Sequence, residues 1–215
     1  MSTTQRQTAE KGIIRELAQL GPVIVDRPFS RAEFLKLAER YPDLQLEREK
    51  NGNILIMTPV KTGSGRRESK ISFFINLWNY DTKKGETFSA STGIELPDGS
   101  IKSPDCAWMT KERFAQLSAE EIEGEFLTLI PDFVAEIRSK SDKPARLKRK
   151  MTDTWIRHGV RLAWLIDPFN EKAYIYRQNG SIEVIDGFAG RYLSGEEVMP
   201  RLALPLDELR LAGKE

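Results

Sequence analysis

Hydrophobic and polar positions near the start of the chain first follow a helical spacing and then a strand spacing. Ser30 and Glu33 match a capping box, and apolar residues recur after them at helical spacing, which predicts a helix that begins at Ser30 and ends near Pro42. Apolar residues then alternate with polar ones on both sides of Asn51-Gly52, the strongest short-range signal for a tight hairpin. We therefore expect a helix followed by two antiparallel strands.

The rest of the pattern predicts two longer helices and a series of short strands. Residues 65–82 place Ile71, Ile75 and Trp78 on one helix face, and residues 143–158 form a second helical pattern with Pro144 near its start. Strands are expected at 87–90, 93–96, 105–109, 133–137, 162–166, 173–176 and 182–185. Strands and helices do not alternate strictly, so a mixed central β-sheet flanked by α-helices is favoured over a parallel one.

Two acidic residues lie in segments that are otherwise apolar: Asp105 within residues 103–108 and Glu136 within residues 131–139. A carboxylate in a half-buried strand is costly unless it is paired, hydrogen-bonded or bound to a cation. The strand period of two places Glu136 and Arg138 on one face and the apolar residues between them on the other. If Asp105 lies on a neighbouring strand with its side chain on the same face, the two carboxylates can share one hard cation.

The composition narrows the choice of cation to magnesium or manganese. Zinc normally recruits histidine and cysteine, but the chain has one His and one Cys. Magnesium keeps most of its waters and needs only a few protein oxygens. A lone cysteine, Cys106, also excludes an intramolecular disulfide and fits a reducing, intracellular setting.

The overall charge and the chain termini predict a soluble, cytoplasmic protein. The chain has 215 residues, and 33 Lys and Arg against 32 Asp and Glu give a net charge of +1, so any surface for nucleic acid must be local. Residues 1–11 lack the apolar stretch of a secretion signal, and no apolar run approaches the roughly 20 residues that span a bilayer. We expect one domain over residues 11–210, between a flexible N-terminus (1–10) and a flexible C-terminus (211–215).

A basic segment follows Glu136 and includes Lys140, Arg146 and Lys148. Such a run can neutralise phosphate oxygens of a nucleic acid. A solvated helix face is the plainer interpretation of a charge run, although its position directly after Glu136 favours function. Both interpretations stay open at this point.

An ordered series of motifs resembles a known family. Pro104-Asp105 is followed by Glu136-Ile137-Arg138-Ser139 at a strand end, then by Lys150-Met151 in a helix, then by Gly159-Val160 and the strand that ends at Asp167-Pro168. This series is similar to the Uma-two family of restriction-endonuclease-like proteins, a branch of the PD-(D/E)XK nuclease superfamily. The resemblance covers residues 29–177.

The resemblance implies an α/β, restriction-endonuclease-like fold, here with an N-terminal helix and β-hairpin added, and it implies roles for particular residues. Asp105 and Glu136 would be metal ligands, and Glu68 resembles an additional acidic ligand on the first core helix. The superfamily places a lysine two residues after the glutamate, where this chain has Arg138, which cannot act as a base but can hold an anion. A helix lysine then takes over, which points to Lys150, with Lys148 as the competing choice.

The function implied is metal-dependent hydrolysis of phosphodiester bonds by an endonuclease, with DNA favoured over RNA as substrate and a homodimer as a possible assembly. Arg138 in place of lysine supports an alternative, a catalytically inactive module that binds nucleic acid or another partner on the same fold. Retention of Asp105, Glu136 and Lys150 together argues against that alternative. A hydrolase for another phosphate-containing substrate is a third interpretation.

Overall fold

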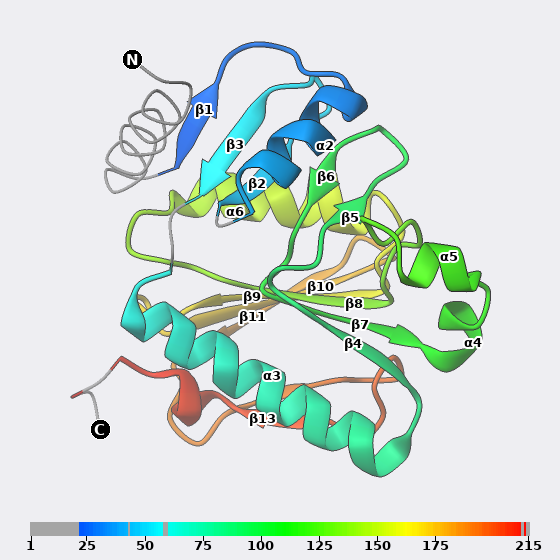
Figure 1. The fold of residues 1–215 in the computed structure, drawn as a ribbon. Coiled ribbons are helices and arrows are strands. Elements are labelled where there is room, and N and C mark those ends of the chain that lie inside the picture. The colour runs from blue at the N-terminus through cyan, green and yellow to red at the C-terminus, as the bar shows by residue number, and fades with distance from the viewer. Residues whose placement is uncertain (1–21, 43, 58–59, 212, 214–215) are drawn as a thin grey trace. The chain divides into compact units, whose positions relative to one another are not determined.

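The computed structural model describes residues 22–42, 44–57, 60–211 and 213 (Figure 1). Its contacts divide the chain into two compact units, Met1–Val60 with Pro97–Lys102, and Lys61–Leu96 with Ser103–Glu215. The single domain over residues 11–210 stays a prediction. The N-terminal segment 1–10 lies outside the described residues, as does most of 211–215. None of the helices in the described part of the chain combines the length and the apolar character needed to cross a membrane.

The first unit contains the predicted helix and hairpin. Helix α2 (Arg31–Arg40) begins with the capping box, in which Ser30 and Glu33 exchange side-chain and backbone hydrogen bonds. Strands β2 (Gln45–Arg48) and β3 (Ile54–Met57) pair antiparallel across the Asn51-Gly52 turn, so both predictions are confirmed. Two strands were not predicted, β1 (Val23–Val25) beside β3 and the two-residue β6 (Ile101–Lys102) beside β2.

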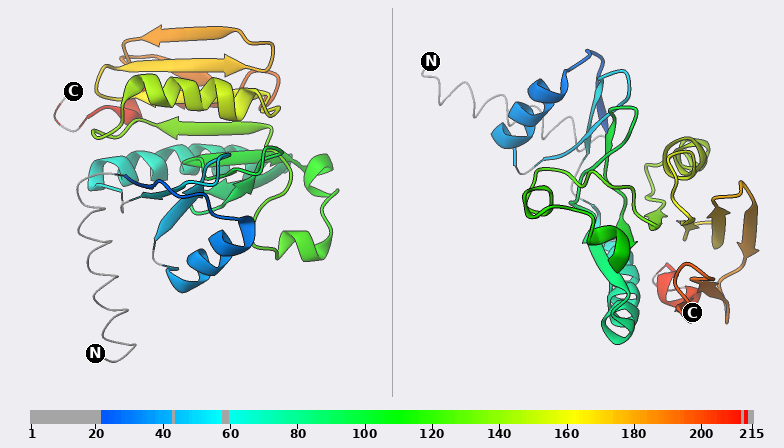
Figure 2. Two further views of the ribbon diagram at one scale, coloured as in Figure 1. Left: turned by 90° about the horizontal axis from the view of Figure 1, so that it is seen from above. Right: turned by 90° about the vertical axis from the view of Figure 1, so that its right-hand side faces the viewer.

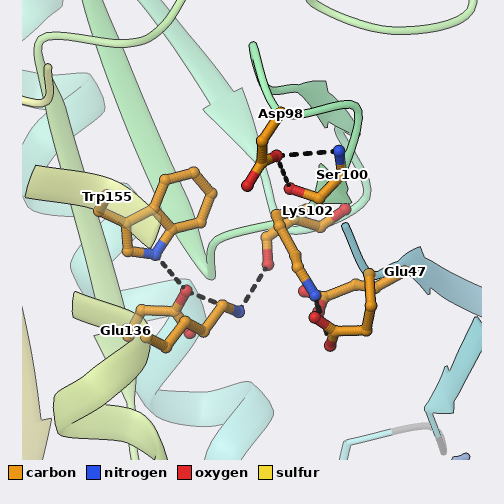
Figure 3. A network of polar contacts seen from close by, with 9 residues as sticks. Glu47, Asp98, Ser100, Lys102, Glu136 and Trp155 are labelled. Carbon is orange, nitrogen blue, oxygen red and sulfur yellow. Dashed lines mark hydrogen bonds and ion pairs between the residues drawn. The ribbon is translucent and has the colours of Figure 1, made fainter. Parts of the chain in front are cut away.

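A buried ion pair joins two strands of this unit. The ammonium of Lys102 on β6 lies 3.1 Å from Glu47 Oε2 on β2 and 2.6 Å from Glu49 Oε1. Figure 3 shows Lys102 directed at Glu47. Both side chains of the Lys102 and Glu47 pair are almost fully buried, and removal of one partner of such a pair is costly.

The second unit is built on a six-stranded sheet of mixed orientation. In spatial order the strands are β11 (Ile182–Asp186), β10 (Lys172–Arg177), β9 (Leu162–Asp167), β8 (Phe133–Ile137), β7 (Cys106–Thr110) and β4 (Gly85–Ser89). Strands β8 and β9 run parallel, and the other neighbours in this sheet pair antiparallel. The predicted mixed sheet is therefore confirmed, and each of the six strands lies where the hydrophobic pattern indicates one.

Helices cover both faces of this sheet. In Figures 1 and 2, helix α3 (Thr62–Thr82) lies on one side of the strands, and the helix formed by α6 (Pro144–Arg149) and η1 (Lys150–Ile156) lies on the other. Ile71 and Ile75 of α3 share a hydrophobic cluster with Phe133, whereas Trp155 of η1 shares a second cluster with Val134. Successive residues of β8 thus face opposite layers, as the period of two predicts.

The second helix differs from the prediction in one respect. The pattern over residues 143–158 indicates an ordinary α-helix, but η1 is a π-helix. Backbone hydrogen bonds from Arg157 N to Thr152 O (3.0 Å) and from Val160 N to Trp155 O (3.1 Å) span five residues instead of four. Such wide turns are rare and occur often at functional sites.

Smaller elements complete the second unit. They are β5 (Ile94–Glu95), α4 (Lys111–Phe114), α5 (Ala119–Ile122), the hairpin of β12 (Tyr192–Ser194) and β13 (Ala203–Pro205), and the 3₁₀-helix η2 (Leu206–Leu209). The first turns of α3 hold the C-terminal segment, because Arg67 Nε donates to Leu209 O at 2.8 Å and Arg66 Nη2 to Arg210 O at 2.6 Å. Leu209 and Arg210, near the C-terminus, are therefore bound to the first helix of the unit.

Candidate active site

Asp105 and Glu136 lie on neighbouring strands of the second unit. Glu136 belongs to β8, and Asp105 directly precedes β7, which pairs antiparallel with β8 through Cys106 opposite Ala135. Asp105 Oδ2 accepts a hydrogen bond of 2.6 Å from the backbone N–H of Ile137. The Asp105 carboxylate is thereby held beside the end of the strand that carries Glu136.

The carboxylate of Glu136 is buried and receives two donors on one oxygen. Lys150 Nζ lies 2.8 Å from Glu136 Oε1 as an ion pair, and the indole Nε1–H of Trp155 donates to the same oxygen at 2.8 Å. Figure 3 shows the indole of Trp155 turned toward Glu136. Lys150 Nζ also lies 3.5 Å from the carbonyl oxygen of Ser103. A buried glutamate with a cationic and a neutral donor is compatible with an ionised carboxylate.

Three acidic groups interact electrostatically at this place. Burial, then Glu136, then Glu68 raise the pKa of Asp105 well above its usual range, whereas the hydrogen bond from Ile137 and the charge of Lys150 lower it. Burial and, second, the charge of Glu136 also raise the pKa of Glu68, which lies in the second turn of α3. Asp105, Glu136 and Glu68, the residues that the sequence proposes as metal ligands, therefore influence one another through their charges.

These carboxylates fit a hard cation in their chemistry. Carboxylate oxygens are the protein ligands that magnesium prefers, and one or two of them suffice because waters and substrate phosphates fill the other positions. Burial first, and repulsion from Glu136 and Glu68 second, raise the pKa of Asp105, and a bound cation would relieve that repulsion. Across residues 22–42, 44–57 and 60–211, no cluster of three or more His, Cys, Asp and Glu side chains is arranged as a metal cage. The fit accordingly rests on Asp105 and Glu136, and Glu68 as a ligand stays a prediction.

Arg138 is engaged by an acidic residue that the sequence analysis did not single out. Its Nη1 lies 3.0 Å from both Oδ1 and Oδ2 of Asp167, and its guanidinium carbon lies 5.2 Å from the centre of the Phe169 ring. Asp167 also accepts backbone hydrogen bonds from Phe169 and Asn170. The guanidinium is therefore fixed at the end of β9 by a carboxylate that also closes the following turn.

The remaining basic candidates occupy different places. Lys140 is exposed in the loop after β8, and Arg146 is exposed on α6. Lys148 Nζ lies 4.2 Å from the centre of the Tyr174 ring on β10, so the structure brings Lys150, and not the competing Lys148, to Glu136. The basic segment thus divides between one lysine beside the carboxylates and several residues at the surface.

Sequence reasoning missed the roles of Trp155 and Asp167. The pattern predicts Trp155 as a core residue, and its side chain is fully buried, but its hydrogen bond to Glu136 leaves no trace in a hydrophobic pattern. Asp167 was interpreted only as the end of a strand. Its pairing with Arg138 depends on the parallel register of β8 and β9, where Ile137 lies opposite Ile166, and a single sequence does not reveal that register.

Comparisons with solved structures give a fold relative. The crystal structure of a putative nuclease belonging to DUF820 from Anabaena variabilis matches with a TM-score of 0.71 and 21% sequence identity, covering 85% of this chain and 97% of that chain. At this level of identity the similarity establishes the fold. It confirms the predicted mixed α/β architecture of a nuclease-like protein. No curated protein sequence matches the chain.

A family model gives the family itself. The model described as Uma2, putative restriction endonuclease, matches residues 31–207, which include every candidate site residue named above. This match confirms the resemblance that the motifs around Asp105, Glu136 and Lys150 indicate. The chain belongs to the Uma2 (Uma-two) family of putative restriction endonucleases.

Proposed function

We propose that this protein is a metal-dependent endonuclease that hydrolyses phosphodiester bonds, with DNA favoured over RNA and with Mg²⁺ or Mn²⁺ as the cation. One observation carries the proposal: Asp105, directly before β7, is hydrogen-bonded to the strand β8 that carries Glu136, and Lys150 reaches the Glu136 carboxylate at 2.8 Å. The family and the fold relative, both described as nucleases, support it.

Asp105 and Glu136 would hold the cation, with Glu68 as a proposed additional ligand. A divalent cation bound there supplies Lewis acidity and lowers the pKa of a bound water. The backbone N–H of Ile137 donates to Asp105 Oδ2 and so holds this carboxylate at the end of β8. Glu136 is oriented by its two donors from the helix, so both ligands are set before any cation binds.

Lys150 is proposed to orient or activate the attacking water. Its ammonium stands between Glu136 Oε1 and the carbonyl oxygen of Ser103, which places a proton donor beside the candidate ligands. A positive charge there also stabilises the charge that develops on the phosphate. Arg138 is proposed to add to this stabilisation from the position in which Asp167 holds it.

The exposed basic residues after β8 are proposed to bind the nucleic acid. Lys140 and Arg146 lie at the surface on the segment that joins Glu136 to Lys150. Lys148, on α6 with Arg146, lies over the ring of Tyr174 on β10. Contacts with phosphate oxygens are independent of base sequence and weaken with salt. They would therefore guide the backbone toward the carboxylates without selecting a sequence.

The test is a cleavage assay with supercoiled, linear and single-stranded DNA and with RNA, in Mg²⁺, Mn²⁺ or a chelator. Asp105→Asn and Glu136→Gln should lose cleavage, because they remove ligand charge with little change of shape. The exposed Glu120, on the short helix α5, provides the control variant Glu120→Gln, which should cleave as the wild type does. Equal cleavage by all four proteins would refute the proposal, and binding of nucleic acid without any cleavage would support the inactive module instead.

A further inference from the structure

The π-helix brings two side chains to the same oxygen of Glu136. Lys150 and Trp155 are five residues apart, and each places a nitrogen 2.8 Å from Glu136 Oε1. In an α-helix, with 3.6 residues per turn, side chains five residues apart point about 140° away from each other. In a π-helix the turn closes on the fifth residue, so both side chains lie on one face. The wide turn is therefore what allows a lysine and a tryptophan to share this carboxylate.

The contact between Trp155 and Glu136 is enclosed on both sides. Trp155 is 0% exposed and packs in the cluster that contains Met151, Val160 and Leu165, while Glu136 is 4% exposed. The residues packed around Trp155 fix the position of its indole ring, so the indole N–H can point in one direction only. A buried polar atom costs free energy unless it is hydrogen-bonded, and here donor and acceptor satisfy each other.

A second tryptophan shows that burial alone does not require such a contact. Trp164 on β9 is also 0% exposed, packs with its ring edge-to-face on Phe133, and its indole Nε1 has no hydrogen-bond partner among the residues that the structure describes. The hydrogen bond of Trp155 is thus a property of its place beside Glu136.

We infer that Trp155 is a positioning residue of the proposed nuclease, and that the π-helix η1 serves to place it. The inference rests on the proposed function. The indole N–H and the Lys150 ammonium meet Oε1 from one helix and so fix the plane of the Glu136 carboxylate. Glu136 would then offer its carboxylate to a bound cation in one orientation. Partners that orient a metal ligand typically change metal affinity or activity about 10- to 100-fold when they are removed.

The chain offers a matched pair of variants for the test. Trp155→Phe removes the indole N–H together with part of the ring, and Trp164→Phe removes the same atoms at a buried site without a hydrogen bond. We expect Trp155→Phe to weaken Mn²⁺ binding, measured by calorimetry, and to lower kcat, each by about tenfold or more. Trp164→Phe should leave both quantities within about twofold of the wild type, because it removes no hydrogen bond to a proposed metal ligand. Trp155→His, which returns a ring N–H, should recover part of the loss.

A spectroscopic measurement tests the same contact without turnover. The chain has four tryptophans, so a ¹H–¹⁵N spectrum shows few indole signals, and the Phe variants identify two of them. The Trp155 signal should shift in Glu136→Ala and upon addition of Mg²⁺, and it should broaden upon addition of Mn²⁺ more than the Trp164 signal does. The metal titrations use the wild-type chain, and if Trp155→Phe does not fold, Phe variants of the other three tryptophans identify the Trp155 signal by elimination.

The possible results separate the inference from the function on which it rests. The positioning role is wrong if Trp155→Phe binds Mn²⁺ and cleaves as Trp164→Phe does. It is also wrong if the Trp155 signal changes neither in Glu136→Ala nor upon addition of the cation. In both cases the proposed nuclease function is unaffected. If the wild type neither binds Mn²⁺ nor cleaves, the proposed function is wrong and the positioning role falls with it.

Discussion

Glu136 and Arg138 stand two residues apart on the polar face of β8 and its extension, yet they meet opposite partners. Glu136 receives cationic and neutral donors from the helix that follows, whereas Arg138 is bound by the carboxylate of Asp167. The arginine two residues after the glutamate is therefore paired with an aspartate at the end of the next strand. Beside Glu136 a positive charge comes from Lys150, the helix residue that we propose in place of the lysine expected at position 138.

The ion pair of Arg138 and Asp167 should contribute to stability. Their side chains are only 18% and 5% exposed, and Asp167 also accepts hydrogen bonds from the turn after β9. Asp167→Asn should lower the free energy of unfolding, measured with urea, by about 1–3 kcal/mol. The control is Asp186→Asn, which breaks the exposed pair with Lys172 and should cost less than Asp167→Asn does. Equal losses of stability in the two variants would show that the Arg138 and Asp167 pair contributes no more than the exposed pair.

The thiol of Cys106 should be inert in the folded protein. It is 1% exposed, and burial raises its pKa to about 12, with Asp105 adding to the shift and Ser72 opposing it. The thiolate is the reactive form, so a raised pKa removes it at mildly alkaline pH. We expect a thiol reagent to label the native chain far more slowly than the chain unfolded in guanidinium chloride. Rapid labelling of the native protein would show that the strand opens or that the thiol ionises.

At the residue scale, the sequence predicts what is anomalous and misses what is ordinary. Asp105 and Glu136 are recognisable because carboxylates are unexpected in apolar strands. Trp155 is unremarkable in a buried helix face, and Asp167 is unremarkable at a strand end, so neither signals its partner. Both partnerships arise from the spatial register of strands and helix, which the residue types alone do not encode.

The element that builds the site is the crossover from β8 through α6 and η1 to β9. Parallel strands need such a connection, and here the helix starts soon after Glu136 and covers the face that bears it. Periodicity was sufficient to predict both strands and the existence of the helix. It was not sufficient for η1, because a π-helix of seven residues is too short to establish its own hydrophobic period. Short strands such as β1 and β12 were missed for the same reason.

The capping box of α2 gives a prediction at this scale. Ser30 accepts from Glu33 N, and Glu33 Oε2 accepts from the Ser30 backbone N–H at 2.8 Å. Ser30→Ala should lower the free energy of unfolding by about 1 kcal/mol. The control Ser69→Ala lies at an exposed position within α3 and should be neutral or slightly stabilising, because alanine is the better helix former. Opposite signs in chemical denaturation would support the cap, and a loss at Ser69 as large as at Ser30 would contradict it.

The same cap should depend on pH. Hydrogen bonds from the Ser30 backbone and side chain lower the pKa of Glu33. A lowered pKa means that the folded state binds the proton less tightly than the unfolded state. The contribution is therefore present above the usual glutamate pKa and is lost as the pH falls through the lowered pKa of the folded state. The difference in stability between the wild type and Ser30→Ala should therefore shrink in acid. A difference that stays constant down to the lowest pH at which the protein is folded would exclude a role for the ionised Glu33.

At the scale of the whole molecule, residues about 140 positions apart close the second unit. The first turns of α3 bind the carbonyl groups of the C-terminal segment through Arg66 and Arg67, and Lys70 pairs with Glu208. Glu68 lies in the same turns, and burial together with the charge of Glu136 raises its pKa. One helix segment thus fastens the end of the unit and carries a candidate ligand, which links the order of the C-terminal segment to the surroundings of the site.

Arg67 and Arg66 make this link testable, because they are neighbours with different burial. Arg67 is 4% exposed and donates to Leu209 O and Gly63 O, whereas Arg66 is exposed and donates to Arg210 O. Arg67→Met keeps most of the side-chain volume but leaves buried carbonyl groups without their donor, so the free energy of unfolding should fall by about 1–3 kcal/mol. Trypsin should then cut after Arg210 faster than in the wild type. Arg66→Gln should change both quantities less, since water can replace an exposed donor. If the two variants behave alike, the C-terminal segment is held by packing and not by the buried arginine.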